Sequence, residues 1–227
     1  MKPIIGISPR TMMAGNNYKI QVNYNYLEPF IERKISTIII PLNDYDLETV
    51  LNLCDGFLVI GGDDIDPIHY GEENTDSREI DALVDNIDLK IIKHAMKHQK
   101  PLLGICRGVQ SLGAFLGGTL IQDINKAGYQ HDVKENSHLV TTVYQNAFTK
   151  AFPDVFPVNS YHHQAIAKVP NDFDVIFKHN DLIEGIMHHT LPILGVQWHP
   201  ERIFTKESKL IFDYFVNEVQ KYNQNKQ

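Results

Sequence analysis

The chain has 227 residues, of which 43% are hydrophobic and 22% are charged, and its formal net charge is -7 at pH 7. A single α/β domain commonly reaches roughly 200 to 250 residues, so we predict one domain over residues 1–227. The acidic balance disfavours nucleic acid and anionic membranes as partners, and no stretch approaches the roughly 18 consecutive apolar residues of a membrane span.

Short apolar runs rich in Ile and Val alternate with helical patterns along the chain. The runs predict strands at residues 4–8, 37–42, 56–60, 102–106, 139–144, 173–177, 184–187 and 193–197. The helical patterns predict helices at residues 24–33, 47–53, 85–98, 109–116 and 206–222. Such alternation is typical of a parallel sheet covered on both faces. We therefore predict an α/β fold, a three-layer, doubly wound, mostly parallel sheet with antiparallel strands added in the second half.

The apolar run at residues 4–8 is too short for a signal peptide, and we interpret it as the first strand. The chain has two cysteines, Cys54 and Cys106. Cys54 lies in an apolar context that is typical of a core residue, and Cys106 has the features of a reactive thiol, so we expect no structural disulfide. These observations predict a cytoplasmic location.

Cys106 stands where a buried strand turns sharply into a helix, in the segment GICRGVQ at 104–110. Gly104 and Gly108 flank it two positions away on each side, which permits the tight turn of a nucleophile elbow. The start of a helix also favours the thiolate form of a cysteine. Far downstream, the segment VQWHPE at 196–201 ends another apolar strand with His199 and Glu201. We predict that Cys106, His199 and Glu201 are nucleophile, base and orienting carboxylate.

Gly61 and Gly62 follow the predicted strand at 56–60. Ligands of open α/β sheets bind at the carboxyl ends of the strands, so this glycine pair should lie near Cys106. We predict that the backbone N–H of Arg107 and that of Gly61 or Gly62 stabilise an oxyanion. A plain strand-to-loop turn is the alternative interpretation of the glycine pair.

Four segments of the chain together resemble the class I glutamine amidotransferase-like superfamily and, within it, the gamma-glutamyl-gamma-aminobutyrate hydrolase family, peptidase family C26. They are CRGVQ (106–110), VQWHPE (196–201), GGDDIDPIHYGE (61–72) and NSYHHQAI (159–166). The similarity extends from residue 3 to residue 215. It departs at Arg78-Glu79 and Asp81, where these hydrolases often carry Arg-Asp and then Glu.

The resemblance implies a flavodoxin-like, class I glutamine amidotransferase-like fold and a gamma-glutamyl hydrolase with a Cys-His-Glu triad. The implied substrate is gamma-glutamyl-gamma-aminobutyrate, an intermediate of putrescine degradation. The resemblance further implies that Gln110 helps hold the glutamyl group, and that Tyr161, His163 and Gln164 bind the amino acid end of the substrate, mainly through their backbone. Two alternatives stay open: a glutaminase subunit that sends ammonia to a synthase partner, and a non-catalytic binding or regulatory protein of the same fold.

The remaining histidines and the acidic residues give weaker evidence of a functional role. His94 and His98 are four residues apart on a predicted helix, but they lack the Glu of an H-E-x-x-H motif and have lysines beside them, so we interpret them as a solvated face. The adjacent histidines at 162–163 and 188–189 cannot both face one ion from a strand.

We interpret the acidic run at 72–88 as an exposed loop and helix start, with a rim or lid over the site as the alternative. We predict no metal and no cofactor. The predicted partner is a small gamma-glutamyl substrate, and a homo-oligomer stays open.

Overall fold

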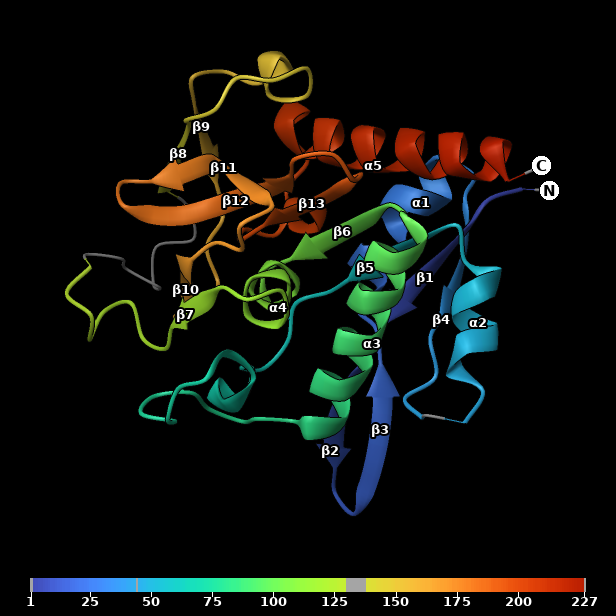
Figure 1. The fold of residues 1–227 in the computed structure, drawn as a ribbon, viewed down its shortest axis with the longest axis horizontal. Helices are drawn as coiled ribbons and strands as arrows, with labels where there is room; N and C mark the ends of the chain where they lie inside the picture. Colours follow the sequence, from blue (N-terminus) through green and yellow to red (C-terminus); the bar gives the residue numbers. More distant parts are fainter. Residues whose placement is uncertain (1, 44, 130–137, 227) are drawn as a thin grey trace.

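The computed structural model describes residues 2–43, 45–129 and 138–226. Its centre is a long mixed sheet with helices on both faces (Figure 1). In the order in which they lie side by side, its main strands are β4 (Ser36–Ile39), β1 (Ile4–Ser8), β5 (Gly56–Val59), β6 (Leu102–Ile105), β13 (Ile193–Val196), β12 (Leu182–His188), β11 (Phe173–His179), β8 (His138–Thr142) and β9 (Val155–Val158).

The sheet divides into a parallel half and an antiparallel half. The pairs from β4 through β13 are parallel, and those from β13 to β9 are antiparallel. Two more strands, β10 (Ala165–Lys168) and β7 (Thr119–Ile121), pair with each other, and β10 also pairs with β12. The predicted mostly parallel sheet with added antiparallel strands is confirmed.

Helices cover the sheet in two layers, each packed on its own part of the core. The helices on one face are α1 (Glu28–Glu32) and α5 (Lys206–Asn225), and those on the other are α2 (Leu47–Leu53), α3 (Ala82–His98) and α4 (Arg107–Phe115). Alternation along β5 shows why both faces are apolar: Leu58 packs in the core beneath α5, whereas Phe57 and Val59 pack in the core beneath α3.

Several local features differ from the sequence prediction, which missed β7, β9 and β10 among the strands. The expected helix at 24–33 is a 3₁₀ turn, η1 (Tyr24–Tyr26), followed by the single short helix α1, which has a proline in its first turn. The hairpin of β2 (Arg10–Ala14) and β3 (Asn17–Gln21) was not predicted, because its polar–apolar alternation covers only the five residues of β3, all of them exposed. Within the described ranges, no helix combines the length and apolar character that crossing a membrane requires.

Candidate active site

The turn between β6 and α4 holds Cys106 in an unusual backbone conformation. Its φ is 54° and its ψ is -109°, a region that residues with a side chain seldom adopt. A Cβ on Gly104 would lie 2.7 Å from the carbonyl carbon of Gly108, and one on Gly108 would overlap the carbonyl oxygen of Val59. The two glycines therefore let α4 start directly against β5 and β6, as the elbow interpretation requires.

The neighbouring strand β13 brings His199 to the same edge of the sheet. Val196 of β13 is paired with Ile105 of β6, so the residues that follow each strand lie close together. His199 precedes the 3₁₀ turn η4 (Pro200–Arg202), and its Nδ1 lies 2.7 Å from Glu201 Oε1. The Asn159 side-chain amide makes two hydrogen bonds with the backbone of His199. Its Oδ1 accepts from the His199 N–H at 2.8 Å, and its Nδ2 donates to the His199 carbonyl at 2.8 Å.

The electrostatic setting of His199 favours a charged imidazole. Burial alone lowers its pKa, but the negative charge of Cys106 and hydrogen bonds with Cys106 and Glu201 outweigh burial and raise the pKa to about 9. An imidazolium beside a thiolate is the charge arrangement of an activated cysteine. The second cysteine has a different environment: Cys54 is fully buried, as predicted, and burial raises the pKa of its thiol to about 12.

Gly61 lies directly against the imidazole. A Cβ at this position would come within 2.9 Å of His199 Cε1 and within 2.9 Å of Tyr26 Oη. The Gly61 N–H donates to Tyr26 Oη at 3.1 Å, and that oxygen lies 3.4 Å from His199 Nδ1. Because Tyr26 occupies the N–H of Gly61, the N–H of Gly62 is the better candidate for an oxyanion donor in this loop.

Arg10, which the sequence analysis missed, fixes the orientation of this loop. Its guanidinium donates from Nε to the carbonyl of Gly61 at 2.8 Å and from Nη2 to the carbonyl of Ile60. Cis peptide bonds are absent from the described residues. In a trans peptide the C=O and N–H point in opposite directions, so holding the Gly61 carbonyl also sets the direction of the Gly62 N–H.

A buried ion network joins Arg10 to the start of α4. Arg10 Nη2 lies 3.1 Å from Asp88 Oδ2, and Arg107 pairs with both Asp85 and Asp88. Both aspartates are fully buried and Arg107 is 2% exposed. The prediction of an exposed acidic segment is therefore wrong for Asp85 and Asp88, because two arginines from distant positions offset the cost of burying them. The Arg107 side chain faces this network, and its N–H belongs to the first turn of α4, where N–H groups have no intrahelical acceptor.

Gln110 reaches the thiol through a second glutamine. Its Nε2 donates to the Gln164 carbonyl at 3.1 Å and to Gln197 Oε1 at 3.2 Å. Gln197, another residue that the sequence analysis missed, donates from Nε2 to Cys106 Sγ at 3.7 Å. Gln110 is thus held by protein groups behind Cys106 rather than among the residues that line the cavity.

The remaining predicted binding residues divide into two groups. The Tyr161 ring is 47% exposed, packs edge-to-face on His199 with ring centroids 5.5 Å apart, and carries the Arg202 guanidinium on its face. His163 instead pairs with Asp64 at 2.9 Å. The Gln164 side chain donates to Ser77 Oγ at 2.9 Å and turns away from the thiol. The structure therefore brings Tyr161 into the cavity, and it places the side chains of His163 and Gln164 against the loop that follows β5.

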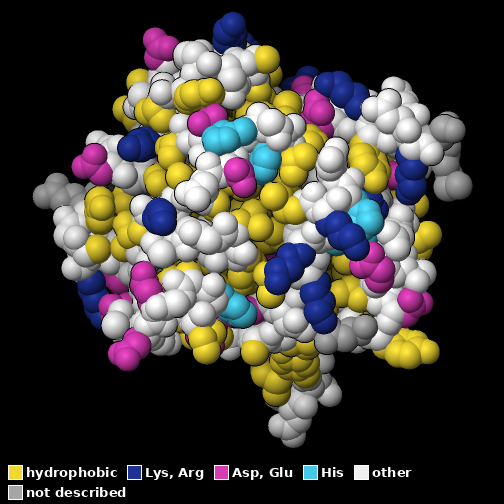
Figure 2. All heavy atoms as spheres, in the orientation of Figure 1, with side chains coloured by type: hydrophobic (Ala, Val, Ile, Leu, Met, Phe, Trp, Pro, Cys, Tyr) yellow, Lys and Arg dark blue, Asp and Glu magenta, His cyan; other side chains and the backbone are white. Residues whose placement is uncertain are grey.

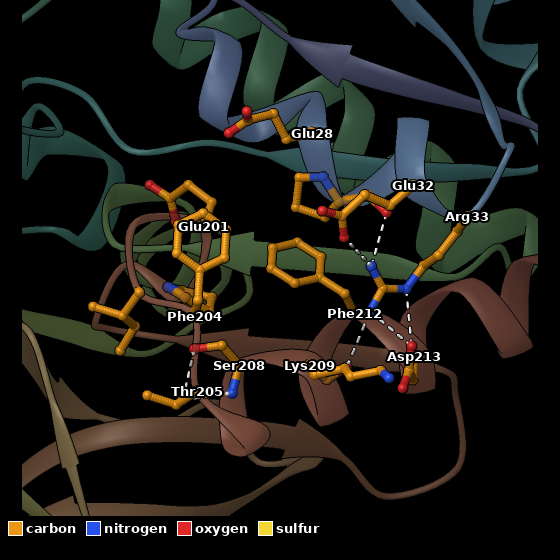
Figure 3. Close-up of a pocket in the computed structure, with 13 residues that line it drawn as sticks. Glu28, Glu32, Arg33, Glu201, Phe204, Thr205, Ser208, Lys209, Phe212 and Asp213 are labelled. Atoms are coloured by element: carbon orange, nitrogen blue, oxygen red, sulfur yellow. Dashed lines mark hydrogen bonds and ion pairs between the residues drawn. The ribbon is translucent and has the colours of Figure 1, made fainter.

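A polar cavity of about 310 Å³ opens above the thiol. Its lining includes Arg10, Gly61, Gly62, Cys106, Tyr161 and His199. A second cavity, of about 440 Å³, lies on the other side of Glu201 between α1 and α5, where Arg33 pairs with Asp213 (Figure 3). Among the described residues, Cys106 lines the first cavity and not the second, so the first is the candidate active site.

Comparisons with known proteins agree with this architecture. The family model described as Peptidase C26 matches residues 3–201. The glutamine amidotransferase-like protein YvdE of Lactococcus lactis is 33% identical over 94% of this chain and 97% of its own length. One component of the glutamine-hydrolysing GMP synthase of Methanospirillum hungatei is 28% identical over 88% of this chain and 91% of its own. A solved structure from Thermoplasma acidophilum, named after the same component of GMP synthase, has a TM-score of 0.73 at 21% identity and covers 100% of this chain and 98% of that chain, which shows the shared fold.

Proposed function

Because the chain belongs to the peptidase C26 family of the class I glutamine amidotransferase-like superfamily, we propose that it is a cysteine-dependent gamma-glutamyl hydrolase. The proposed substrate is gamma-glutamyl-gamma-aminobutyrate, which would yield glutamate and gamma-aminobutyrate. The observation that carries the proposal is that the strained Cys106 elbow and His199 line one cavity, with Glu201 in contact with the imidazole.

In the first half of the reaction, the Cys106 thiolate attacks the gamma-carbonyl carbon of the substrate and a carbon–sulfur bond forms. The developing oxyanion accepts hydrogen bonds from the N–H groups of Gly62 and Arg107. The carbon–nitrogen bond then breaks, and the His199 imidazolium gives its proton to the leaving amine. A gamma-glutamyl thioester on Cys106 remains.

In the second half, neutral His199 takes a proton from water, and the resulting hydroxide attacks the thioester carbon. The carbon–sulfur bond breaks, glutamate leaves and the thiolate–imidazolium pair is restored. Glu201 accepts the hydrogen bond from Nδ1 throughout, which fixes the tautomer that places Nε2 for these transfers.

A glutaminase subunit of an amidotransferase is the second candidate. The similarity to a component of a glutamine-hydrolysing GMP synthase favours it, and such a protein would use the same thiol chemistry on glutamine. The two candidates differ in the leaving group, which is ammonia for glutamine and a larger amine for the hydrolase.

A panel of gamma-glutamyl amides that includes glutamine separates the two. We expect a higher kcat/KM for gamma-glutamyl-gamma-aminobutyrate, because contacts to the amine portion contribute binding in the transition state that glutamine cannot make. Glutamate release is the readout for each amide. A preference for glutamine that grows when a synthase-containing extract is added would instead support the glutaminase subunit.

A further inference from the structure

Helices α2 and α3 bring together three side chains that the sequence keeps far apart. His94 and His98 lie one turn apart on α3, with ring centroids separated by 4.3 Å. Glu48 on α2 reaches both of them: its Oε2 lies 3.3 Å from His94 Nδ1, and its Oε1 lies 3.8 Å from His98 Nε2. One ligand atom from each residue can be chosen so that all three lie within 4.8 Å of one another.

These separations suit a transition-metal ion. With metal–nitrogen and metal–oxygen distances of about 2.0–2.1 Å, two ligands of a tetrahedral ion lie roughly 3.3 Å apart. His94 Nδ1 already has this spacing from Glu48 Oε2, whereas His98 Nε2 lies 3.8 Å from the other carboxylate oxygen, Oε1, so the side chains must adjust to hold one ion. Imidazole and carboxylate together are donors that Zn²⁺ accepts, and a fourth position would fall to water.

The burial of the histidines points the same way. His94 is 4% exposed, with its ring edge-on to Phe57. His98 Nε2, the nitrogen that faces Glu48, is buried and has no hydrogen bond in the described part of the chain, which is a second indication of an absent ligand. His94 would bind the ion through Nδ1, which also faces Glu48.

We propose that Glu48, His94 and His98 bind a divalent transition-metal ion such as Zn²⁺ and thereby join α2 to α3. This revises the sequence-based prediction of no metal, which was made without a third ligand for the two histidines. The site is separate from the catalytic cavity, since α3 ends at His98 just before the amino end of β6 and Cys106 follows the carboxyl end of that strand.

Nearby lysines should weaken the binding of a metal ion at this site. Lys93 and Lys97 line the same open cavity of about 380 Å³, together with Glu48 and His94. Figure 2 shows a histidine, an acidic side chain and lysines gathered on the face that α2 and α3 cover. The positive charge of the lysines opposes a dication, so we expect an exchangeable ion rather than one required for folding.

Isothermal titration calorimetry with Zn²⁺ tests the site. The titration uses the Cys106→Ala variant, because the Cys106 thiol and His199 can themselves bind zinc. We expect one equivalent of Zn²⁺ per chain at this site and a Zn²⁺-dependent rise in Tm. Each of the substitutions Glu48→Gln and His98→Ala, added to Cys106→Ala, should weaken that binding by at least about tenfold.

The controls separate metal binding from folding. His189→Ala in the same background removes a half-exposed histidine outside the cluster and should leave the titration unchanged. The metal-free Tm of every variant checks the fold, and the buried His94 is left intact for this reason. The proposal is overturned if Cys106→Ala binds no Zn²⁺ at this stoichiometry, or if the Glu48→Gln and His98→Ala variants titrate like the His189→Ala control.

Discussion

Two buried charged groups flank Cys106, and they differ in what they contact. His199 lines the cavity in which the thiol lies, and Glu201, outside that lining, contacts its Nδ1. On the other side, Arg10, Asp88 and Arg107, together with Asp85, form a network of equal numbers of formal positive and negative charges. In the first group, the surroundings of His199 raise its pKa, and His199 can exchange protons with a substrate. The second holds backbone segments in place.

Burial of charge alone therefore does not identify a catalytic group. A buried ion pair adds little net stability, yet removing one partner is costly because the other charge stays buried. The network therefore makes the positions of the Gly61–Gly62 loop and of the α4 start depend on each other. We propose that the pair performs the proton transfers and that the network positions the oxyanion donors.

Removing the Cys106 thiol should lower activity more than any other single change described here. Cys106→Ala should lower glutamate release by at least about a thousandfold, with Tm little changed because alanine fits the elbow. Cys106→Ser should also be nearly inactive, since a hydroxyl does not ionise near neutral pH. The measurements are steady-state glutamate release and thermal unfolding. Activity above about one per cent of wild type, with contamination excluded, would contradict a covalent role for this residue.

His199→Ala should approach the loss seen for Cys106→Ala, because the thiol and the base act as a unit. Combining the two substitutions should add little further loss. Rate constants of the two single variants and the double variant provide this comparison. Losses that multiply in the double variant would show independent action and would separate His199 from the thiol chemistry.

Glu201→Gln should lower kcat less than Cys106→Ala or His199→Ala does, and it should also shift the pH profile. A raised pKa means that the His199 imidazolium persists as pH increases and is lost near pH 9, so kcat/KM should fall on that alkaline side. Removing the Glu201 charge removes one contribution that raises this pKa, and the alkaline limb should therefore move to lower pH. An unchanged limb in the variant would argue against the His199–Glu201 coupling.

The smallest effect, about tenfold in kcat with KM little changed, is expected for Arg10→Lys. Lysine keeps the charge opposite Asp88 but lacks the planar fork that holds the carbonyls of Ile60 and Gly61. The matched control is Arg33→Lys, which alters an arginine paired with Asp213 away from the thiol cavity. If Arg10→Lys lowers Tm but leaves kcat at the level of the control, Arg10 has a structural role only.

The sequence predicted the parallel half of the sheet because its strands are short apolar runs with helices between them. The elbow was equally readable, since Gly104 and Gly108 surround Cys106 within a few positions. Arg10 and its network were not, because Asp88 lies far along the chain and a lone arginine after a strand carries no pattern. Glu48 was missed for the same reason: its proximity to His94 arises from helix packing rather than from spacing.

The hairpin of β2 and β3, which lies outside the long sheet, was harder to predict. In β3, Tyr18 and Ile20 alternate with polar residues, but this pattern covers only five residues and all of them are exposed. Gln197 shows a related limit in the site, since its sequence position beside His199 does not reveal that its amide lies between Gln110 and the thiol.

Formation of a gamma-glutamyl thioester on Cys106 can be tested by trapping that intermediate. Protein mixed with excess gamma-glutamyl-gamma-aminobutyrate is quenched in acid within one turnover, digested, and mapped by mass spectrometry. We predict a mass increase of one glutamyl group on the peptide that contains Cys106 and none on the peptide that contains Cys54. Glutamate release in a single turnover with Cys106 unmodified at every quench time, or with the adduct on Cys54, would contradict the claim.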